Sequence, residues 1–124
     1  MILVVDDDNQ ARSMIVAALA SFGFKTAEAV DGPTALVLAR NTRFEAVILD
    51  FVMPGMTGAE TAEELARIDP DLPIIFATGY ADEAALHQEL GRTVPVLHKP
   101  FPIWELASVL TLVTRQVNHL TRQH

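Results

Sequence analysis

The sequence has 124 residues, contains no cysteine and carries a formal net charge of -7 at pH 7. A chain of this length suits one domain, so we predict a single domain over residues 1–124, and without cysteine neither a disulfide nor a thiol site is available. The acidic balance, with no cluster of basic residues, argues against binding of nucleic acid or of an anionic membrane by this domain.

Short apolar runs alternate with helical patterns along the whole chain. The first run, Ile2 to Val5, is too short and too soon followed by acidic residues for a signal peptide or a membrane span, so we expect a cytoplasmic protein. The pattern predicts strands at residues 2–5, 25–30, 46–50, 74–77 and 94–97, with Thr78 at the carboxyl end of the fourth. The helices between and after them are predicted from 11 to 22, from 32 onward, from 58 to 68, from a cap at 82 to 91, and from about 102 to 120.

The helix boundaries follow from residues that favour helix ends. Asp8 and Asp82 are placed to cap the first and fourth helices, and Pro33 suits the first turn of the second. Gly23 and Gly91 are placed to end the first and fourth helices. The residues predicted to face the core are Ala62, Leu65 and Ala66 in the third helix, and Ile103, Leu106, Ala107, Leu110, Val113 and Val117 in the fifth.

The order of the strands follows from their polarity. The strands at 2–5, 46–50 and 74–77 are continuously apolar up to the final Asp50, which is typical of strands covered on both faces in the middle of a parallel sheet. The strand at 25–30 is half polar, and the strand at 94–97 contains Pro95, which cannot donate to a ladder, so both belong at edges. Right-handed crossovers then give the order 2-1-3-4-5, a flavodoxin-like doubly wound α/β fold with five parallel strands.

This order brings residues from distant parts of the chain to one edge of the sheet. Asp6, Asp7 and Asp50 lie at the carboxyl ends of neighbouring strands, and Thr78 and Lys99 follow the next two. Carboxylates so close repel by roughly 1 to 4 kcal/mol per pair at an effective dielectric near 20, so they need a cation or protons. Oxygen ligands that leave room for water suit Mg²⁺. A carboxylate such as Asp50 can then attack a phosphoryl group, with Lys99 and Thr78 neutralising its oxygens.

At these residues the chain resembles the receiver domain of two-component response regulators, the CheY-like superfamily. The residues that carry the resemblance span nearly the whole chain: Asp6, Asp7, Asp50, Met53, Pro54, Gly55, Gly58, Thr78, Lys99, Pro100 and Phe101. The resemblance implies that Asp50 is the phosphoacceptor. It implies that Asp7, Asp50 and the backbone carbonyl of Val52 bind Mg²⁺, that Asp6 acts through water, and that Thr78 and Lys99 hold the phosphoryl group. It also implies a cis peptide bond between Lys99 and Pro100.

The resemblance further implies an activity in phosphorelay signal transduction. A phosphohistidine on a histidine kinase or a histidine phosphotransfer domain would donate its phosphoryl group to Asp50, so we expect a signalling module rather than a turnover enzyme. The aspartyl phosphate would draw Thr78 inward and repack the face formed by the fourth helix, the fifth strand and the fifth helix. The family often has Tyr or Phe three residues before the lysine, but this chain has Val96, so an aromatic switch is not expected here.

The residues also bear on the origin of the chain and on three other functions. Residues 76–80 resemble the corresponding segment in receivers of hybrid sensor histidine kinases, which favours that origin over a stand-alone regulator. A flavodoxin would place a phosphate loop where this chain has three aspartates, and an aspartyl-phosphate phosphatase or mutase would have an aspartate where Val52 stands. A degenerate receiver that binds partners without phosphorylation stays open as the alternative. The four histidines lack the spacing of metal ligands, so a histidine metal site is not expected. Trp104 fits either a partner surface or a packed start of the last helix.

Overall fold

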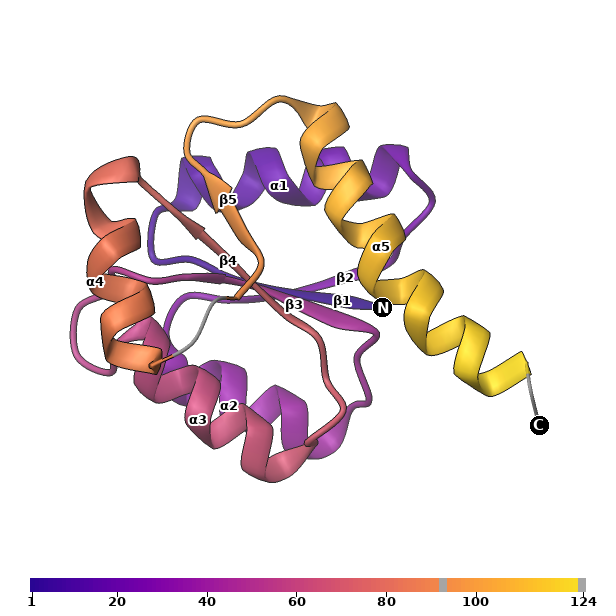
Figure 1. The fold of residues 1–124 in the computed structure, drawn as a ribbon, viewed down its shortest axis with the longest axis horizontal. Helices are drawn as coiled ribbons and strands as arrows, with labels where there is room; N and C mark the ends of the chain where they lie inside the picture. Colours follow the sequence, from indigo (N-terminus) through magenta and orange to yellow (C-terminus); the bar gives the residue numbers. More distant parts are fainter. Residues whose placement is uncertain (92–93, 123–124) are drawn as a thin grey trace.

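The computed structural model describes residues 1–91 and 94–122, with side chains for all of these except residues 80 and 114–122 (Figure 1). Over these residues, five strands alternate with five helices. The strands are β1 (Ile2–Val5), β2 (Thr26–Ala29), β3 (Ala46–Asp50), β4 (Ile74–Thr78) and β5 (Val96–His98). The helices are α1 (Asn9–Ser21), α2 (Gly32–Asn41), α3 (Gly58–Ile68), α4 (Tyr80–Leu90) and α5 (Ile103–Arg122).

The five strands form one parallel sheet in the order β2-β1-β3-β4-β5, which confirms the predicted topology. The register pairs Val5 with Leu49 and Asp50 with Ala77, so the carboxyl ends of the three central strands are level with one another. Thr78 pairs with His98 at the same end of the sheet. Residues that directly follow β1, β3, β4 and β5 are therefore neighbours in space.

Two layers of helices cover the sheet. Helices α1 and α5 lie on one face, and α2, α3 and α4 lie on the other (Figure 1). Successive residues of β1 illustrate why: Ile2 packs with the α1 and α5 side, whereas Leu3 packs with the α2, α3 and α4 side. Because both faces are buried, the central strands carry the unbroken apolar runs seen in the sequence. No helix in the described part of the chain is long and apolar enough to cross a membrane.

Several predicted element boundaries differ from those in the structure, and the starts of α4 and β5 are the clearest cases. Helix α4 begins at Tyr80 with Gly79 at its N-cap and no capping side chain, so Asp82 lies within its first turn. There the carboxylate still favours the helix, because it lies near the positive end of the helix dipole. Strand β5 begins at Val96 rather than Val94, although the carbonyl of Pro95 still accepts a 3.0 Å hydrogen bond from the Phe76 amide.

The first helix cap was predicted correctly, whereas two inward-facing residues were not. The Asp8 carboxylate accepts hydrogen bonds from the amides of the first turn of α1. Ala66 is exposed, because the buried side of α3 is centred on Ala62 and Leu65, and one further residue turns the helix by about 100°. Ile103 is also exposed, because α5 meets the sheet only from Leu106 onward. The side chain of Val117 lies outside the described residues, and that of Trp104 is 69% exposed.

Candidate functional site

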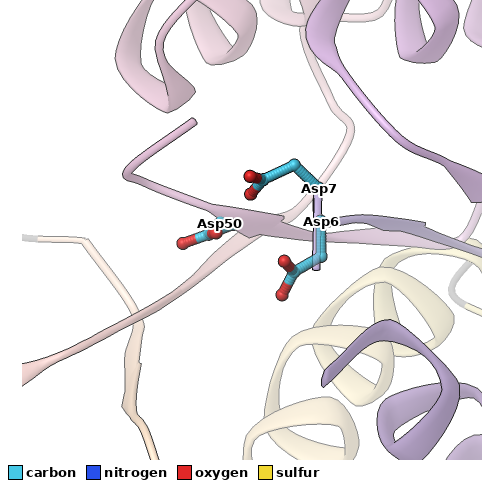
Figure 2. Close-up of side chains that lie close together, drawn as sticks. All are labelled: Asp6, Asp7 and Asp50. Carbon is cyan, nitrogen blue, oxygen red and sulfur yellow. The ribbon is translucent and has the colours of Figure 1, made fainter. Parts of the chain in front are cut away.

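Three carboxylates meet at the carboxyl ends of β1 and β3. Asp6, Asp7 and Asp50 each offer one oxygen, and these oxygens lie within 4.8 Å of one another. In Figure 2 the Asp7 side chain lies above the strand ends and the Asp6 side chain below them, with Asp50 beside both. Asp6 and Asp50 are buried, whereas Asp7 is exposed, so the cluster is held by the protein on one side and is open to solvent on the other.

Lys99 supplies a positive charge to this cluster. Its ammonium nitrogen lies 2.8 Å from Oδ2 of Asp6, to which it donates a hydrogen bond, and 3.6 Å from Oδ2 of Asp50. The backbone amide of Lys99 donates to the Thr78 carbonyl at 2.8 Å, and the peptide bond from Lys99 to Pro100 is cis, as predicted. One ammonium faces three carboxylates, so the site keeps an excess of negative charge that favours a further cation.

The surroundings of Asp50 change its proton affinity. Burial raises the pKa of Asp50 to about 6, with the ammonium of Lys99 opposing this shift and the nearby charges of Asp6 and Asp7 adding to it. Burial by itself lowers the pKa of Lys99, but the hydrogen bond to Asp6 and the charge of Asp50 outweigh it, so the pKa of Lys99 is raised. At neutral pH both groups are charged, and Asp50 is a carboxylate that can act as a nucleophile.

The donor atoms at the site fit Mg²⁺. The three acidic side chains offer only oxygen, which is the ligand type that Mg²⁺ prefers, and the open side at Asp7 leaves room for water or phosphate oxygens. Val52 lies two residues after the end of β3, and its amide donates to Oδ1 of Asp50 at 3.3 Å. The expected ligand role of the Val52 carbonyl stays a prediction.

The loop between β3 and α3 is closed against the end of β3 by Gly58. The Gly58 amide donates to the Phe51 carbonyl at 3.0 Å. A Cβ at position 58 would lie 2.5 Å from the carbonyl oxygen of Asp50 and 2.6 Å from Cα of Phe51, which are distances that real Cβ atoms do not adopt. A glycine at this position therefore lets helix α3 begin directly against the backbone that carries Asp50.

Thr78 ends β4 next to the cluster. The register pairs Asp50 with Ala77, so Thr78 lies one position further toward the site on the neighbouring strand. Its side chain is buried, and its hydroxyl has no hydrogen-bond partner within the described residues. A buried hydroxyl without a partner is unfavourable by about 1 to 3 kcal/mol, so this group is available to a ligand oxygen.

Arg12, which was not predicted as a site residue, binds the backbone of the turn that carries Asp6 and Asp7. Its guanidinium donates to the backbone carbonyl of Asp6 at 2.8 Å and to the Glu28 carboxylate at 3.0 Å. The one available signal was its place in the first turns of α1, since side chains of a helix point back toward its N-terminus. That signal indicates nearness to the strand end but does not identify the partner in β2.

The remaining polar residues near the site have other partners. Asp8 caps α1, as expected, and is not in the cluster of carboxylates. His98 lies on the edge strand β5, and its Nε2 is 2.5 Å from a carboxylate oxygen of Glu83 in α4. Within the described part of the chain, no group of three or more potential metal ligands includes a histidine. The side chains of His119 and His124 lie outside the described residues.

Comparison with known proteins gives consistent matches to one family. The sequence matches the family model of the response regulator receiver domain over residues 2–111. It is 37% identical over 109 residues to the response regulator receiver protein CpdR of Brucella abortus, a match that covers 86% of this chain and 90% of that protein. It is 38% identical over 109 residues to the DNA-binding response regulator MtrA of Mycolicibacterium smegmatis, which covers 86% of this chain but 47% of that protein. The chain thus spans about half the length of several curated relatives.

One solved structure with a similar fold contains a bound metal ion. The receiver domain of the sensor histidine kinase PA1611 from Pseudomonas aeruginosa matches with a TM-score of 0.82 and 28% identity, covering 91% of this chain and 95% of that chain. That structure contains a magnesium ion coordinated in its active site cleft. A protein with a similar fold is therefore known to bind magnesium.

Proposed function

The chain belongs to the family of response regulator receiver domains, which are phosphoacceptor modules of two-component signalling, and from this membership we propose that Asp50 accepts the phosphoryl group. The observation that supports this assignment best is the cluster itself. Asp50 shares this cluster with two further acidic side chains, and its carboxylate lies 3.6 Å from the ammonium of Lys99. We also propose that residues 1–124 form one such domain, and that it works in the cytoplasm.

The proposed reaction transfers a phosphoryl group from nitrogen to oxygen. A carboxylate oxygen of Asp50 attacks the phosphorus of a phosphohistidine on a histidine kinase or a histidine phosphotransfer domain. The new P–O bond forms as the P–N bond breaks, and the electron pair of that bond stays on the imidazole nitrogen of the donor. Water later attacks the phosphorus, which releases inorganic phosphate and restores the Asp50 carboxylate.

The acidic side chains are proposed to hold Mg²⁺ during this transfer. Asp7, Asp50 and the Val52 carbonyl would be its direct protein ligands, and Asp6 would act through a water molecule. Bound there, the ion would neutralise charge on the phosphoryl oxygens. Asp6 is already engaged by the ammonium of Lys99, which supports its assignment to the outer position.

Lys99 and Thr78 are proposed to hold the phosphoryl group. The Lys99 ammonium lies 3.6 Å from a carboxylate oxygen of Asp50, close enough to pair with an oxygen of a group bound to that carboxylate. Thr78 brings a buried hydroxyl for which the described part of the chain offers no partner, and it can donate to another phosphoryl oxygen. Both residues bind or orient the group, and neither supplies the nucleophile.

The signalling change is proposed to spread from Thr78 into α4 and β5. Thr78 pairs with His98 in the sheet, and His98 binds Glu83 of α4, so a shift of Thr78 has a direct path to that helix. Val96 cannot act as an aromatic switch, so this path depends on backbone movement. Amide exchange on residues 80–90 with and without beryllofluoride, a phosphoryl mimic, tests this step. Identical protection in both states would contradict it.

Labelling with acetyl phosphate and Mg²⁺ tests the proposed function. The wild-type chain should take up one phosphoryl group, measured by intact mass, and Asp50→Asn should take up none. Asp8→Asn serves as a matched control, because Asp8 caps α1 and lies outside the cluster. Absence of uptake by the wild type would favour the alternative, a degenerate receiver that binds partners without phosphorylation.

A further inference from the structure

The guanidinium of Arg12 joins three parts of the chain behind the acidic cluster. It donates to the carbonyl oxygen of Asp6 at the end of β1, to the carboxylate of Glu28 in β2, and to the side-chain oxygen of Asn9 at the start of α1, at 2.8, 3.0 and 2.6 Å. The Arg12 side chain is only 12% exposed. This is a fixed arrangement rather than a solvated surface pair, since three different acceptors use separate N–H groups of one planar fork.

These contacts fix the backbone that carries two of the three carboxylates. The amide of Asp6 donates to the Ala29 carbonyl at 3.1 Å, and the carbonyl of Asp6 accepts from Arg12. The peptide unit before Asp6 is therefore held by β2, and the peptide unit between Asp6 and Asp7 is held by Arg12 of α1. No hydrogen bond within the described residues holds the Asp7 carboxylate, so the position of this exposed side chain depends on the backbone beneath it.

We propose that Arg12 is a positioning residue for the divalent cation site, and this inference rests on the proposed function of the acidic cluster. Arg12 holds the turn so that Asp6 and Asp7 face Asp50. A lysine could not replace it, because a single ammonium on a flexible stem does not match three acceptors in a fork geometry. Partners behind the metal ligands typically change metal affinity by about 10- to 100-fold when they are removed.

A purely electrostatic role of Arg12 predicts the opposite change in Mg²⁺ affinity from a positioning role, so the direction of that change separates the two explanations. If Arg12 acted only through its positive charge, then removing that charge would make the site more negative and would strengthen Mg²⁺ binding. If Arg12 positions the turn, removing it weakens Mg²⁺ binding despite the loss of positive charge. Arg12→Lys keeps the charge and loses the fork, so it isolates the positioning contribution.

The test measures the Mg²⁺ dissociation constant of the wild type, Arg12→Ala, Arg12→Lys and Arg67→Ala by isothermal titration calorimetry. Arg67 pairs with Glu64 on the exposed surface of α3, so Arg67→Ala removes the same charge away from the turn. We expect Mg²⁺ binding about tenfold weaker in both Arg12 variants and unchanged binding in Arg67→Ala. Amide exchange of residues 6–8 in metal-free protein should be faster in the Arg12 variants, and this readout does not depend on activity.

Three outcomes would overturn the inference: tighter or equal Mg²⁺ binding in Arg12→Ala, wild-type binding in Arg12→Lys, or loss of folding in both variants, which would make the role of Arg12 purely structural. A failure of the proposed function looks different. In that case the wild type itself binds no Mg²⁺ and takes up no phosphoryl group from acetyl phosphate. If the wild type binds Mg²⁺ and takes up a phosphoryl group, and the Arg12 variants bind Mg²⁺ equally well, only the positioning role is contradicted.

Discussion

The ammonium of Lys99 donates a 2.8 Å hydrogen bond to the carboxylate of Asp6, although 93 residues separate the two in the sequence. Their meeting follows from the parallel sheet, which places the ends of β1 and β5 at one edge. Asp6 is almost fully buried, and a buried charge without a partner is strongly unfavourable. The ammonium of Lys99 thus stabilises the acidic cluster in the metal-free protein. It also competes with a metal ion for the same carboxylates.

Replacing Lys99 by methionine should change metal binding and phosphoryl uptake in opposite directions. Without the ammonium, the three carboxylates attract Mg²⁺ more strongly, by about three- to tenfold at low salt. Uptake from acetyl phosphate should become slower, because no ammonium neutralises the phosphoryl oxygens. Calorimetry and mass spectrometry measure the two effects. Lys25→Met removes the same charge just before β2, at the opposite end of the sheet, and should change neither. A parallel loss of binding and uptake in Lys99→Met would contradict the competition.

Mg²⁺ binding should weaken as the pH falls through 6. The pKa of Asp50 is about 6 in the metal-free protein, so below this pH the carboxylate takes up a proton that a cation must displace. Binding at pH 5 should be about tenfold weaker than at pH 8, with proton release near pH 6 that is visible as a dependence of the calorimetric heat on the buffer. Asp50→Asn should lack this proton release, and its presence in that variant would assign the pH dependence to another group.

The same pKa predicts how stability depends on pH without metal. The pKa of Asp50 is raised above its usual value near 3.8, so the folded state binds the proton more tightly than the unfolded state. The resulting stability is complete below pH 3.8 and is lost as the pH rises through 6. Asp50→Asn removes this loss, so at pH 8 it should be more stable than the wild type by about 1 kcal/mol, allowing for solvent screening. Urea unfolding at pH 8 and pH 4 tests this, and an equal difference at both values would contradict it.

The sequence alone predicted the sheet and the composition of the site, because both depend on strong local patterns. The polarity of the strands determined the order 2-1-3-4-5, and that order placed Asp7, Asp50, Thr78 and Lys99 at one edge. The structure brings the three carboxylates and Lys99 into contact distance, although the chemical role of each stays a prediction.

What could not be predicted depends on contacts between elements. Arg12 meets Glu28 across 16 residues only because α1 packs beside β2, and no local pattern contains that packing. The first residue of α4 was missed because two nearby residues, Gly79 and Asp82, both suit a helix start. The sequence also could not predict that the Thr78 hydroxyl has no hydrogen-bond partner within the described residues, because this depends on the three-dimensional positions of the surrounding donors and acceptors.

Gly58→Ala should disturb the site through the backbone. The new Cβ would lie 2.5 Å from the Asp50 carbonyl oxygen, so the end of β3 or the start of α3 must shift, at a cost of about 1 to 3 kcal/mol in unfolding free energy. Because Asp50 moves with that backbone, Mg²⁺ binding should weaken as well. Gly79→Ala is the matched control, since its Cβ would meet only an Asp82 side-chain oxygen at 3.8 Å. Wild-type stability and Mg²⁺ affinity in Gly58→Ala would contradict this prediction.

Thr78→Val tests separately how the Thr78 hydroxyl affects the stability of the protein and how it affects binding of a phosphoryl group. The Thr78 hydroxyl is buried and has no partner among the side chains and backbone that the structure describes, so replacing it by a methyl group should leave stability unchanged or raise it by up to about 1 kcal/mol. Thr61 is the matched control, because its equally buried hydroxyl donates to the Thr57 carbonyl at 2.8 Å, and Thr61→Val should lose about 1 kcal/mol.

Binding of a phosphoryl mimic should show the opposite ranking of the two variants. If the Thr78 hydroxyl donates to a phosphoryl oxygen, Thr78→Val loses one charge-assisted hydrogen bond, and its affinity for beryllofluoride with Mg²⁺ should fall about tenfold. Thr61→Val should keep wild-type affinity, because α3 places that hydroxyl against its own helix. Fluorine NMR titration measures the bound fraction. If Thr78→Val is destabilised like Thr61→Val and still binds beryllofluoride normally, the hydroxyl serves the fold, and the phosphoryl group is held by Lys99 and backbone amides instead.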